Sequence, residues 1–149
     1  MHWVVDGMNV IGSRPDGWWR DRAGARRRLV SDLATLAAPD TEVTVVFDGR
    51  PDTGEVEAAR AQGVAARFAP GGPNAADHAI VELLGSLGDP AGITVVTSDA
   101  ALVDSVRRAG VAVEGAKTFR ARLPGDDATE GLRGGPRRGA RGPRRPPRS

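Results

Sequence analysis

Four aspartates stand where a parallel sheet would bring them together. Asp6, Asp48 and Asp99 each follow an apolar run, and Asp77 opens a predicted helix after another such run. In an open α/β sheet the carboxyl ends of the strands lie along one edge, and ligands bind in the crevice there. We therefore expect the four carboxylates to form one cluster at that edge.

Such a cluster is unfavourable unless its charge is neutralised. Two carboxylates ~4 Å apart repel each other by about 4 kcal/mol at an effective dielectric constant of ~20. Bound protons or cations relieve this repulsion. A site made only of oxygen ligands favours Mg²⁺ or Mn²⁺ over zinc. The sequence therefore predicts a metal-dependent enzyme that acts on phosphate esters.

The stretch from Asp6 to Gly12 is the most specific of these motifs. An aspartate that ends a buried strand is costly unless its charge is used. Gly7 would let the backbone turn closely around a ligand, and Asn9 would supply a neutral oxygen or an orienting hydrogen bond. The structural alternative for the same residues is an Asx turn.

The other three aspartates also have structural alternatives. Asp77 follows Asn74 by three residues, which is the spacing of a helix N-cap and its capping partner. Asp99 follows Ser98, another possible N-cap, and Asp48 precedes a glycine, as in an ordinary turn. Asp77 and Asp99 nevertheless share helix faces with apolar residues, so we expect both carboxylates to face the sheet.

Aromatic and basic residues near this edge are candidate substrate contacts. Trp18 and Trp19 could stack on unpaired bases, each worth ~1–3 kcal/mol, or pack over the first long helix. Arg50 could neutralise a phosphate or Asp48, and Thr97 and Ser98 could orient Asp99 or a phosphate. The full candidate set is Trp18, Arg50, Ser98, Lys117 and Arg120.

Two further groups of charged residues are assigned to the surface. The triplet Arg26-Arg27-Arg28 on a predicted helix is typical of a solvated face, with phosphate contact as the alternative. His78 is expected to be a surface histidine, although its place beside Asp77 would also suit a proton shuttle.

Alternating strands and helices predict the scaffold for these residues. An apolar stripe at the 3.6-residue period marks each longer helix, and a nearly continuous Val/Phe run marks a strand buried on both faces. This order predicts an α/β fold with a parallel sheet and right-handed crossovers. The expected strands are 2–6, 43–47, 64–69, 93–97 and 111–114, and the expected helices lie at 21–37, 55–62, from Asp77 onward, and after Asp99.

Composition excludes several classes of protein. The 149-residue chain has no cysteine, which rules out disulfides, thiolate zinc sites and cysteine nucleophiles. It starts without a basic segment followed by an apolar one, so no signal peptide is expected. No apolar run approaches the ~20 residues of a membrane span. We expect a cytoplasmic protein without membrane contact.

Charge and composition divide the chain near residue 123. Residues 1–123 carry 14 Lys+Arg and 16 Asp+Glu, a net charge of −2, whereas residues 124–149 carry seven Arg and three acids, a net charge of +4. The second segment is rich in Gly, Pro and Arg and is predicted to be disordered. Such a tract either follows a nucleic-acid backbone or only solubilises the protein. The predicted division is a domain at 1–123 and a basic tail at 124–149.

Taken together, these motifs resemble those of the YacP-like NYN domain, a branch of the PIN-like nucleases. The resemblance covers most of residues 2–123, and the tail lies outside it. One departure from the family is that His78 and Ala79 follow Asp77, where the family often has a larger acidic set. The stretches that carry the resemblance are 4–12, 45–48, 75–77, 95–99 and 115–120.

The resemblance implies a PIN-like three-layer α/β/α sandwich and an Mg²⁺- or Mn²⁺-dependent endoribonuclease. It implies that Asp6, Asp77 and Asp99 hold one or two ions, with Asn9 beside them and Asp48 completing the metal shell. Single-stranded RNA is the expected substrate, because its bases can splay onto aromatic side chains. Ribosome-bound or other translation-associated RNA is the expected context.

Two other functions remain open on the sequence alone. A non-catalytic RNA-binding adaptor with a PIN-like fold would fit the basic tail equally well. A phosphatase with an aspartyl nucleophile would also use a strand-end aspartate and Mg²⁺. That chemistry generally needs a second acid two residues on, where this chain has Met8.

Overall fold

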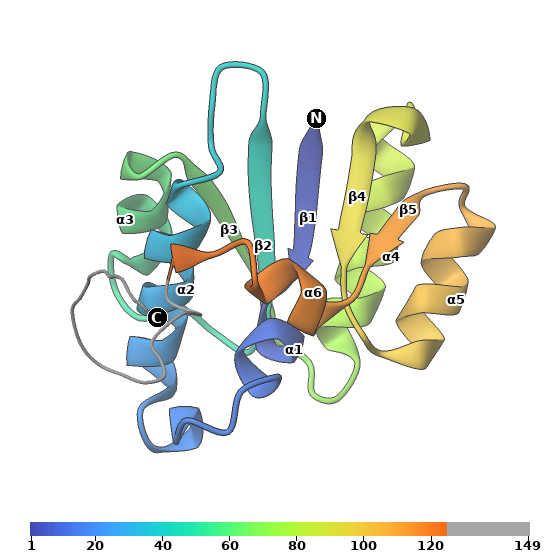
Figure 1. The fold of residues 1–149 in the computed structure, drawn as a ribbon. Helices are drawn as coiled ribbons and strands as arrows, with labels where there is room; N and C mark the ends of the chain where they lie inside the picture. The colour runs from blue at the N-terminus through green and yellow to red at the C-terminus, as the bar shows by residue number, and fades with distance from the viewer. Residues whose placement is uncertain (125–149) are drawn as a thin grey trace, which may run out of the picture. The chain divides into compact units, whose positions relative to one another are not determined.

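A computed structural model describes residues 1–124 of the chain. These residues contain a central sheet of five parallel strands (Figure 1). The strand order is β3-β2-β1-β4-β5, so β1 lies at the centre and the two halves extend outward from it. The strands are β1 (His2–Asp6), β2 (Glu42–Asp48), β3 (Val64–Ala69), β4 (Ile93–Val96) and β5 (Ala112–Glu114).

Six α-helices connect and cover these strands, which confirms the predicted α/β/α class. Short 3₁₀ turns, η1 (Trp18–Arg20) and η2 (Pro90–Gly92), precede α2 and β4. The helices are α1 (Gly7–Gly12), α2 (Arg22–Ala34), α3 (Glu55–Ala61), α4 (Ala75–Leu87), α5 (Ala100–Arg108) and α6 (Ala116–Arg120).

Alternation along the central strand assigns its side chains to two faces of the sheet. Val4 is fully buried in a core that it shares with Val46 and Val95 of the adjacent strands and with apolar side chains of α4 and α5. Asp6 lies two residues further on and therefore projects from the same face. The period of the strand thus directs this carboxylate toward α4 and α5.

The opposite face is covered by α1, α2 and α6, with α3 beside α2 (Figure 1). Trp3 of β1 contacts Phe119 of α6 at a ring-centroid distance of 5.1 Å, and Phe47 of β2 contacts Phe68 of β3 at 5.3 Å. These aromatic pairs fill the second core layer, which lies away from the face that bears Asp6.

The predicted elements are present, with differences at their ends. The helix expected at 21–37 ends at Ala34, and the strand expected at 93–97 ends at Val96, so Thr97 begins the connection to α5. The stretch after Asp6 forms the short helix α1, and its N-cap Asp6 makes no side-chain capping hydrogen bond, so the alternative of an Asx turn is not observed.

The contacts divide the chain into two units, Met1–Phe119 and Arg120–Ser149. The four aspartates all belong to the first unit. Most of the predicted tail at 124–149 lies outside the described residues, so that prediction stays untested. Within residues 1–124, none of the helices combines the length and apolar character that crossing a bilayer requires.

Candidate active site

Asp6 is a buried carboxylate at the carboxyl edge of the sheet. Its exposed fraction is 5%, and Thr97 donates a hydrogen bond from Oγ1 to Asp6 Oδ2 at 2.9 Å. Burial raises the pKa of Asp6 to about 6, opposed by the Thr97 hydrogen bond and reinforced by the charges of three other aspartates, Asp77, Asp48 and Asp99. The most deeply placed acid is therefore the one whose charge is most costly.

Thr97 connects Asp6 with the start of α5. Its side chain is almost fully buried, and its Oγ1 also accepts a hydrogen bond from the backbone N–H of Asp99 at 3.1 Å. One hydroxyl thus fixes the Asp6 carboxylate and the backbone from which the Asp99 side chain projects. The sequence indicates Thr97 as a residue that could orient Asp99 or a phosphate, but it does not predict the contact with Asp6, which depends on where β4 ends.

Asp99 is the N-cap of α5. Its Oδ1 accepts a hydrogen bond from the backbone N–H of Leu102 at 3.0 Å. The alternative of an acid behind a Ser98 cap is therefore wrong, since Ser98 Oγ instead accepts from the backbone N–H of Ala116 at 2.8 Å. Capping uses only one carboxylate oxygen, and the second oxygen of Asp99 remains available to a ligand.

Asp48 extends from the end of β2 to the N-terminus of α4. Its Oδ1 accepts a hydrogen bond from the backbone N–H of Ala76 at 3.1 Å, so a side chain from another element caps this helix. Asn74 occupies the N-cap position with a left-handed φ of 68° but makes no capping hydrogen bond with its side chain. The expected capping box of Asn74 and Asp77 is therefore not formed.

Asp77 lies in the first turn of α4, half-buried and beside the other carboxylates. Burial raises its pKa, as do the charges of Asp99 and Asp48, whereas His78 lowers it. Among the described residues Asp77 has no hydrogen-bond partner, which leaves its side chain free to rotate toward a ligand. His78 is exposed, as predicted for a surface histidine.

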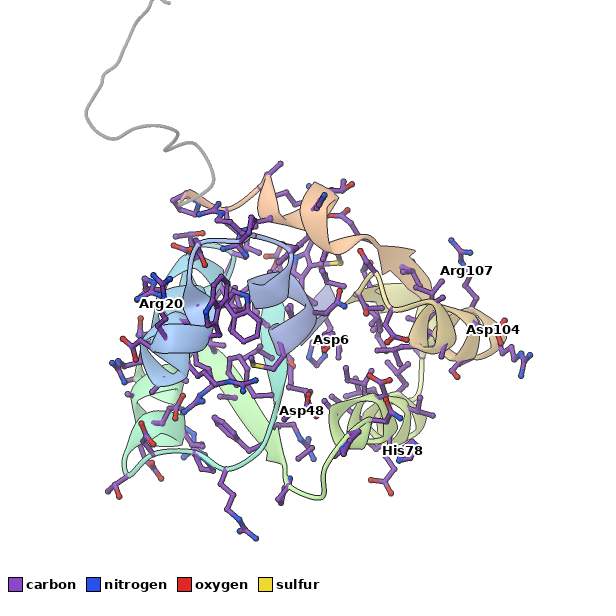
Figure 2. All side chains as sticks on the ribbon, turned by 90° about the horizontal axis from the view of Figure 1, so that it is seen from below. Asp6, Arg20, Asp48, His78, Asp104 and Arg107 are labelled. Atoms are coloured by element: carbon purple, nitrogen blue, oxygen red, sulfur yellow. The ribbon has the colours of Figure 1, made fainter. Side chains whose placement is uncertain are left out.

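The structure thus brings the four predicted acids to one edge of the sheet. Figure 2 looks onto this edge and shows Asp6 and Asp48 near its middle, with His78 on α4 and Asp104 and Arg107 at the outer side of α5. Burial is the main cause of the raised pKa values of Asp6 and Asp77, and the charges of Asp48 and Asp99 contribute to both.

The donor set can be compared with the divalent ion predicted from the sequence. Four carboxylates at one edge, with the pKa values of Asp6 and Asp77 raised, are suited to a hard cation with oxygen ligands. As the side chains stand in residues 1–124, however, no group of three His, Cys, Asp or Glu is close enough to hold a metal ion. The chemistry of the site fits, and convergence on an ion requires side-chain rotation.

Gly7 has a packing role that the sequence did not predict. An added Cβ at Gly7 would lie 2.5 Å from the ring of Phe47, so glycine is required for α1 to pack against β2. The close approach of the Gly7 backbone to a ligand stays a prediction.

Asn9 orients the loop between β4 and α5. Its Oδ1 accepts a hydrogen bond from the backbone N–H of Ser98 at 2.8 Å, which is the orienting role expected of it. Asn9 and Ser98 line an open cavity of about 400 Å³ together with Lys117, so two of the predicted substrate contacts lie beside the acids.

The remaining candidate contacts are more scattered. Trp18 is half-buried and packs edge-on against Trp19, which is 52% exposed. Arg22 lies over the Trp18 ring, and Arg20 lies over the Trp19 ring. Arg50 is exposed in the loop after β2. Arg120 is the last residue of α6 and begins the second unit, so it is not assigned to the site.

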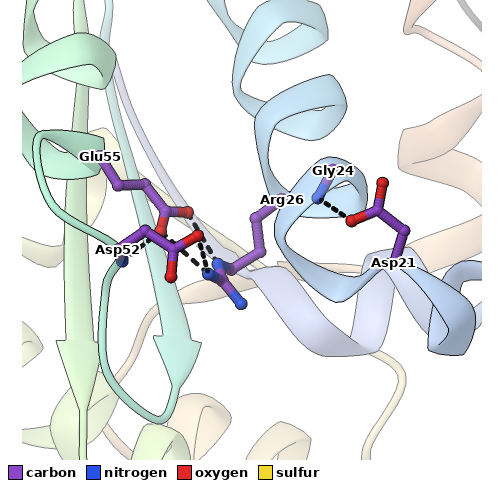
Figure 3. Close-up of polar contacts among 5 residues, drawn as sticks. All are labelled: Asp21, Gly24, Arg26, Asp52 and Glu55. Atoms are coloured by element: carbon purple, nitrogen blue, oxygen red, sulfur yellow. Dashed lines mark hydrogen bonds and ion pairs between the residues drawn. The ribbon is translucent and has the colours of Figure 1, made fainter.

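Arg26 departs most clearly from the sequence prediction. Arg26 is only 9% exposed and donates from Nε and Nη2 to the Glu55 carboxylate at 2.7 and 2.9 Å (Figure 3). Its guanidinium also lies over the Phe68 ring. Glu55 also accepts from the backbone N–H of Asp52 at 2.9 Å. This buried pair joins α2 to α3 and to the loop that follows Asp48. Arg27 and Arg28 are exposed, as predicted for the triplet.

Comparison with known proteins identifies the family. Residues 3–129 match the YacP-like NYN domain. The crystal structure of Rae1 (YacP) from Bacillus subtilis is similar, with 26% identity, a TM-score of 0.66, and coverage of 82% of this chain and 72% of that one. A second structure of that protein, its W164L mutant, has the same fold, with 24% identity, a TM-score of 0.62, and coverage of 82% and 73%.

A search of curated protein sequences gave no significant match. The family match extends a few residues beyond the resemblance inferred from the motifs and spans most of the chain. The fold, the matched residues and the edge of aspartates agree, and the chain belongs to the YacP-like NYN domain family, a family of PIN-like nucleases.

Proposed function

We propose that the protein is a metal-dependent endoribonuclease that cleaves single-stranded RNA at the aspartate edge. The observation that carries this proposal is the buried Asp6 carboxylate, whose pKa of about 6 reflects burial and three neighbouring carboxylates. A fold without use for this charge would gain stability by losing it. Membership of a nuclease family gives that charge a function.

Asp6, Asp77 and Asp99 would hold Mg²⁺ or Mn²⁺ as one or two ions, with Asp48 as a further oxygen donor. A bound cation would lower the pKa of the water that it binds and would stabilise charge on the scissile phosphate. The chain's own contribution is orientation. Thr97 fixes Asp6, and the helix cap fixes Asp99.

The surroundings of the acids favour an extended, unpaired RNA strand. Trp19 is half-exposed beside Trp18, and bases of a single strand can stack on such rings. Arg50 and Lys117 are exposed cations that would contact phosphates. RNA engaged in translation would present an unpaired strand of this kind, so translation-associated RNA is the proposed source of substrate.

Cleavage of a labelled single-stranded RNA tests this function. Wild type, Asp6→Asn and the control Asp104→Asn would be incubated with Mn²⁺, Mg²⁺ or EDTA. Asp104 is an exposed acid on the outer side of α5 (Figure 2), where it pairs with Arg108. Wild type and Asp104→Asn should cleave with metal only, and Asp6→Asn should lose at least about 100-fold in rate, as expected when a transition-state contact is removed.

Other results would point elsewhere. Salt-sensitive RNA binding by wild type without cleavage of any RNA in either metal would favour the non-catalytic adaptor. Equal cleavage by Asp6→Asn would exclude the aspartate edge as the catalytic site.

A further inference from the structure

One open cavity lies directly beside the aspartate edge but contains none of the four acids. It encloses about 400 Å³, within the range of about 300–1,000 Å³ that is typical of small-ligand sites. Its walls come from α1, from the loop between β4 and α5, and from α6. They include Met8, Asn9, Gly12, Ser98, Lys117 and Thr118.

Ser98 in the loop between β4 and α5 connects the cavity to the acids. Asn9 lines the cavity and accepts a hydrogen bond from the backbone N–H of Ser98. Ser98 stands between Thr97, which holds Asp6, and the helix cap Asp99. A ligand in the cavity would therefore lie next to any phosphate bound at the carboxylates.

The Asn9 amide also has a defined orientation. In the Asn side chain only the amide oxygen can accept a hydrogen bond, so the Ser98 contact assigns Oδ1 and leaves Nδ2 as the remaining donor. Among the described residues Nδ2 has no partner, and it is not one of the buried unsatisfied atoms, so it is open to solvent. Asn9, whose amide keeps this N–H donor, thus lines the cavity together with the flexible apolar Met8 and the cationic Lys117.

From this combination we infer that the cavity receives the base of the nucleotide next to the scissile phosphate. A base has a flat apolar face, which suits Met8, and edge acceptors, which suit Asn9 Nδ2. Lys117 would hold the adjoining phosphate. The inference rests on the proposed ribonuclease function for the position of the phosphate, but nucleotide binding by the cavity can be measured separately.

The test is an NMR titration of the ¹⁵N-labelled full chain in EDTA with each of the four ribonucleoside 5′-monophosphates. Inorganic phosphate serves as the probe without a base. Wild type should show base-dependent shifts of the Asn9 side-chain amide and the Ser98 backbone amide that phosphate alone does not produce.

Two substitutions add side-chain volume to the cavity lining, one on α1 and one on α6. Gly12→Leu adds a side chain whose Cβ would meet only Trp18, at 3.9 Å, and Thr118→Leu enlarges an exposed residue of α6. Gly85→Leu is the matched control, because nothing lies within 4 Å of a Cβ at that position on α4. Both filling variants should weaken nucleotide binding at least about tenfold, whereas Gly85→Leu should bind like wild type.

Each other result has a definite meaning, provided the variants keep dispersed spectra. Equal shifts with phosphate alone, absence of nucleotide binding by wild type, or unchanged binding by both filling variants would overturn the inference. Loss in Gly12→Leu alone would assign the effect to Trp18 and also overturn it. Base-dependent binding by a wild type that cleaves no RNA would keep the cavity and reject the nuclease function.

Discussion

At the residue scale, the buried charge of Asp6 lowers the stability of the folded state. Its folded pKa of about 6 lies above the ordinary value of 3.8 because of burial. The folded state therefore binds a proton more tightly than the unfolded state, and stability contributed by this group rises as pH falls from about 7 toward 4. The ionised carboxylate costs up to about 3 kcal/mol at neutral pH, at ~1.4 kcal/mol per pKa unit.

We expect Asp6→Asn to increase the free energy of unfolding at pH 7.5 without metal, by about 1–3 kcal/mol. Urea denaturation at pH 7.5 and pH 5 checks this, since the difference between wild type and variant should shrink at pH 5. His2, whose pKa is lowered by burial, acts in the opposite direction in both proteins and cancels in the difference.

The control is Asp104→Asn, which removes an exposed charge and should change stability by less than about 0.5 kcal/mol. Added Mn²⁺ should stabilise wild type more than Asp6→Asn, because only wild type keeps the buried carboxylate. A variant less stable than wild type at pH 7.5 would show that the Thr97 hydrogen bond matters more than the buried charge.

The sequence indicated the four candidate acids but not how they are held. The candidates could be identified because each follows an apolar run, and the strand and helix periods make such runs recognisable. They are Asp6, Asp48, Asp77 and Asp99. The contacts of Thr97 depend on which strands are adjacent, and the requirement for glycine at position 7 depends on a ring from β2. Such contacts between distant residues leave no local pattern.

At the element scale, Arg26 and Glu55 join α2 to α3 and to the loop after Asp48. Burial is the largest influence and would raise the Glu55 pKa, but the Arg26 hydrogen bonds, the Asp52 backbone hydrogen bond and the charges of Arg26 and Arg27 together lower it. Glu55 therefore contributes stability above its unfolded pKa, and that contribution is lost as pH falls through the lower folded value. The pair restrains the loop that carries Arg50.

Removing one member of this pair should be far more harmful than removing both. Arg26→Met leaves the Glu55 carboxylate buried without its cation, and we expect a loss of about 3 kcal/mol in the free energy of unfolding. The double variant Arg26→Met/Glu55→Gln should recover at least half of that loss. Urea denaturation of the single and double variants at pH 7.5 measures the coupling.

The matched control is Arg108→Met, which breaks an exposed ion pair with Asp104 of 2.8 Å. An exposed pair of this kind contributes about 0–1 kcal/mol. If Arg26→Met were as mild as Arg108→Met, the Arg26 pair would not act as a buried link between α2 and α3.

The helix starts show why some elements are hard to predict. The sequence pattern places α4 correctly but assigns its cap to Asn74, because capping is usually inferred from neighbouring residues. The actual cap, Asp48, comes from the end of β2, so it joins two elements of the site. Likewise α1 is too short to show a helical period, and a turn is the natural prediction for it.

At the scale of the whole molecule, the order of strands and helices was enough to predict the fold. Nearly continuous apolar strands between amphipathic helices allow few arrangements besides a parallel sheet covered on both faces. Because the strands are parallel, their carboxyl ends lie at one edge of the sheet. Four acids that are far apart in the chain could therefore be expected to lie together. The role of the Arg-rich segment has no such constraint and remains a prediction.

The segment after residue 123 carries seven arginines, against a net charge of −2 for the preceding residues. If these arginines contact RNA phosphates, changing all seven to serine in the full chain should weaken RNA binding. The slope of log affinity against log salt should also fall by about 0.7 for each phosphate that is no longer neutralised. Filter binding at low and high salt measures this, and cleavage at saturating RNA should stay near wild type because the aspartate edge is unchanged.

As a control, amide substitution of the three acids in the segment should steepen the slope or leave it unchanged. An unchanged slope in the serine variant would restrict the tail to a solubilising role.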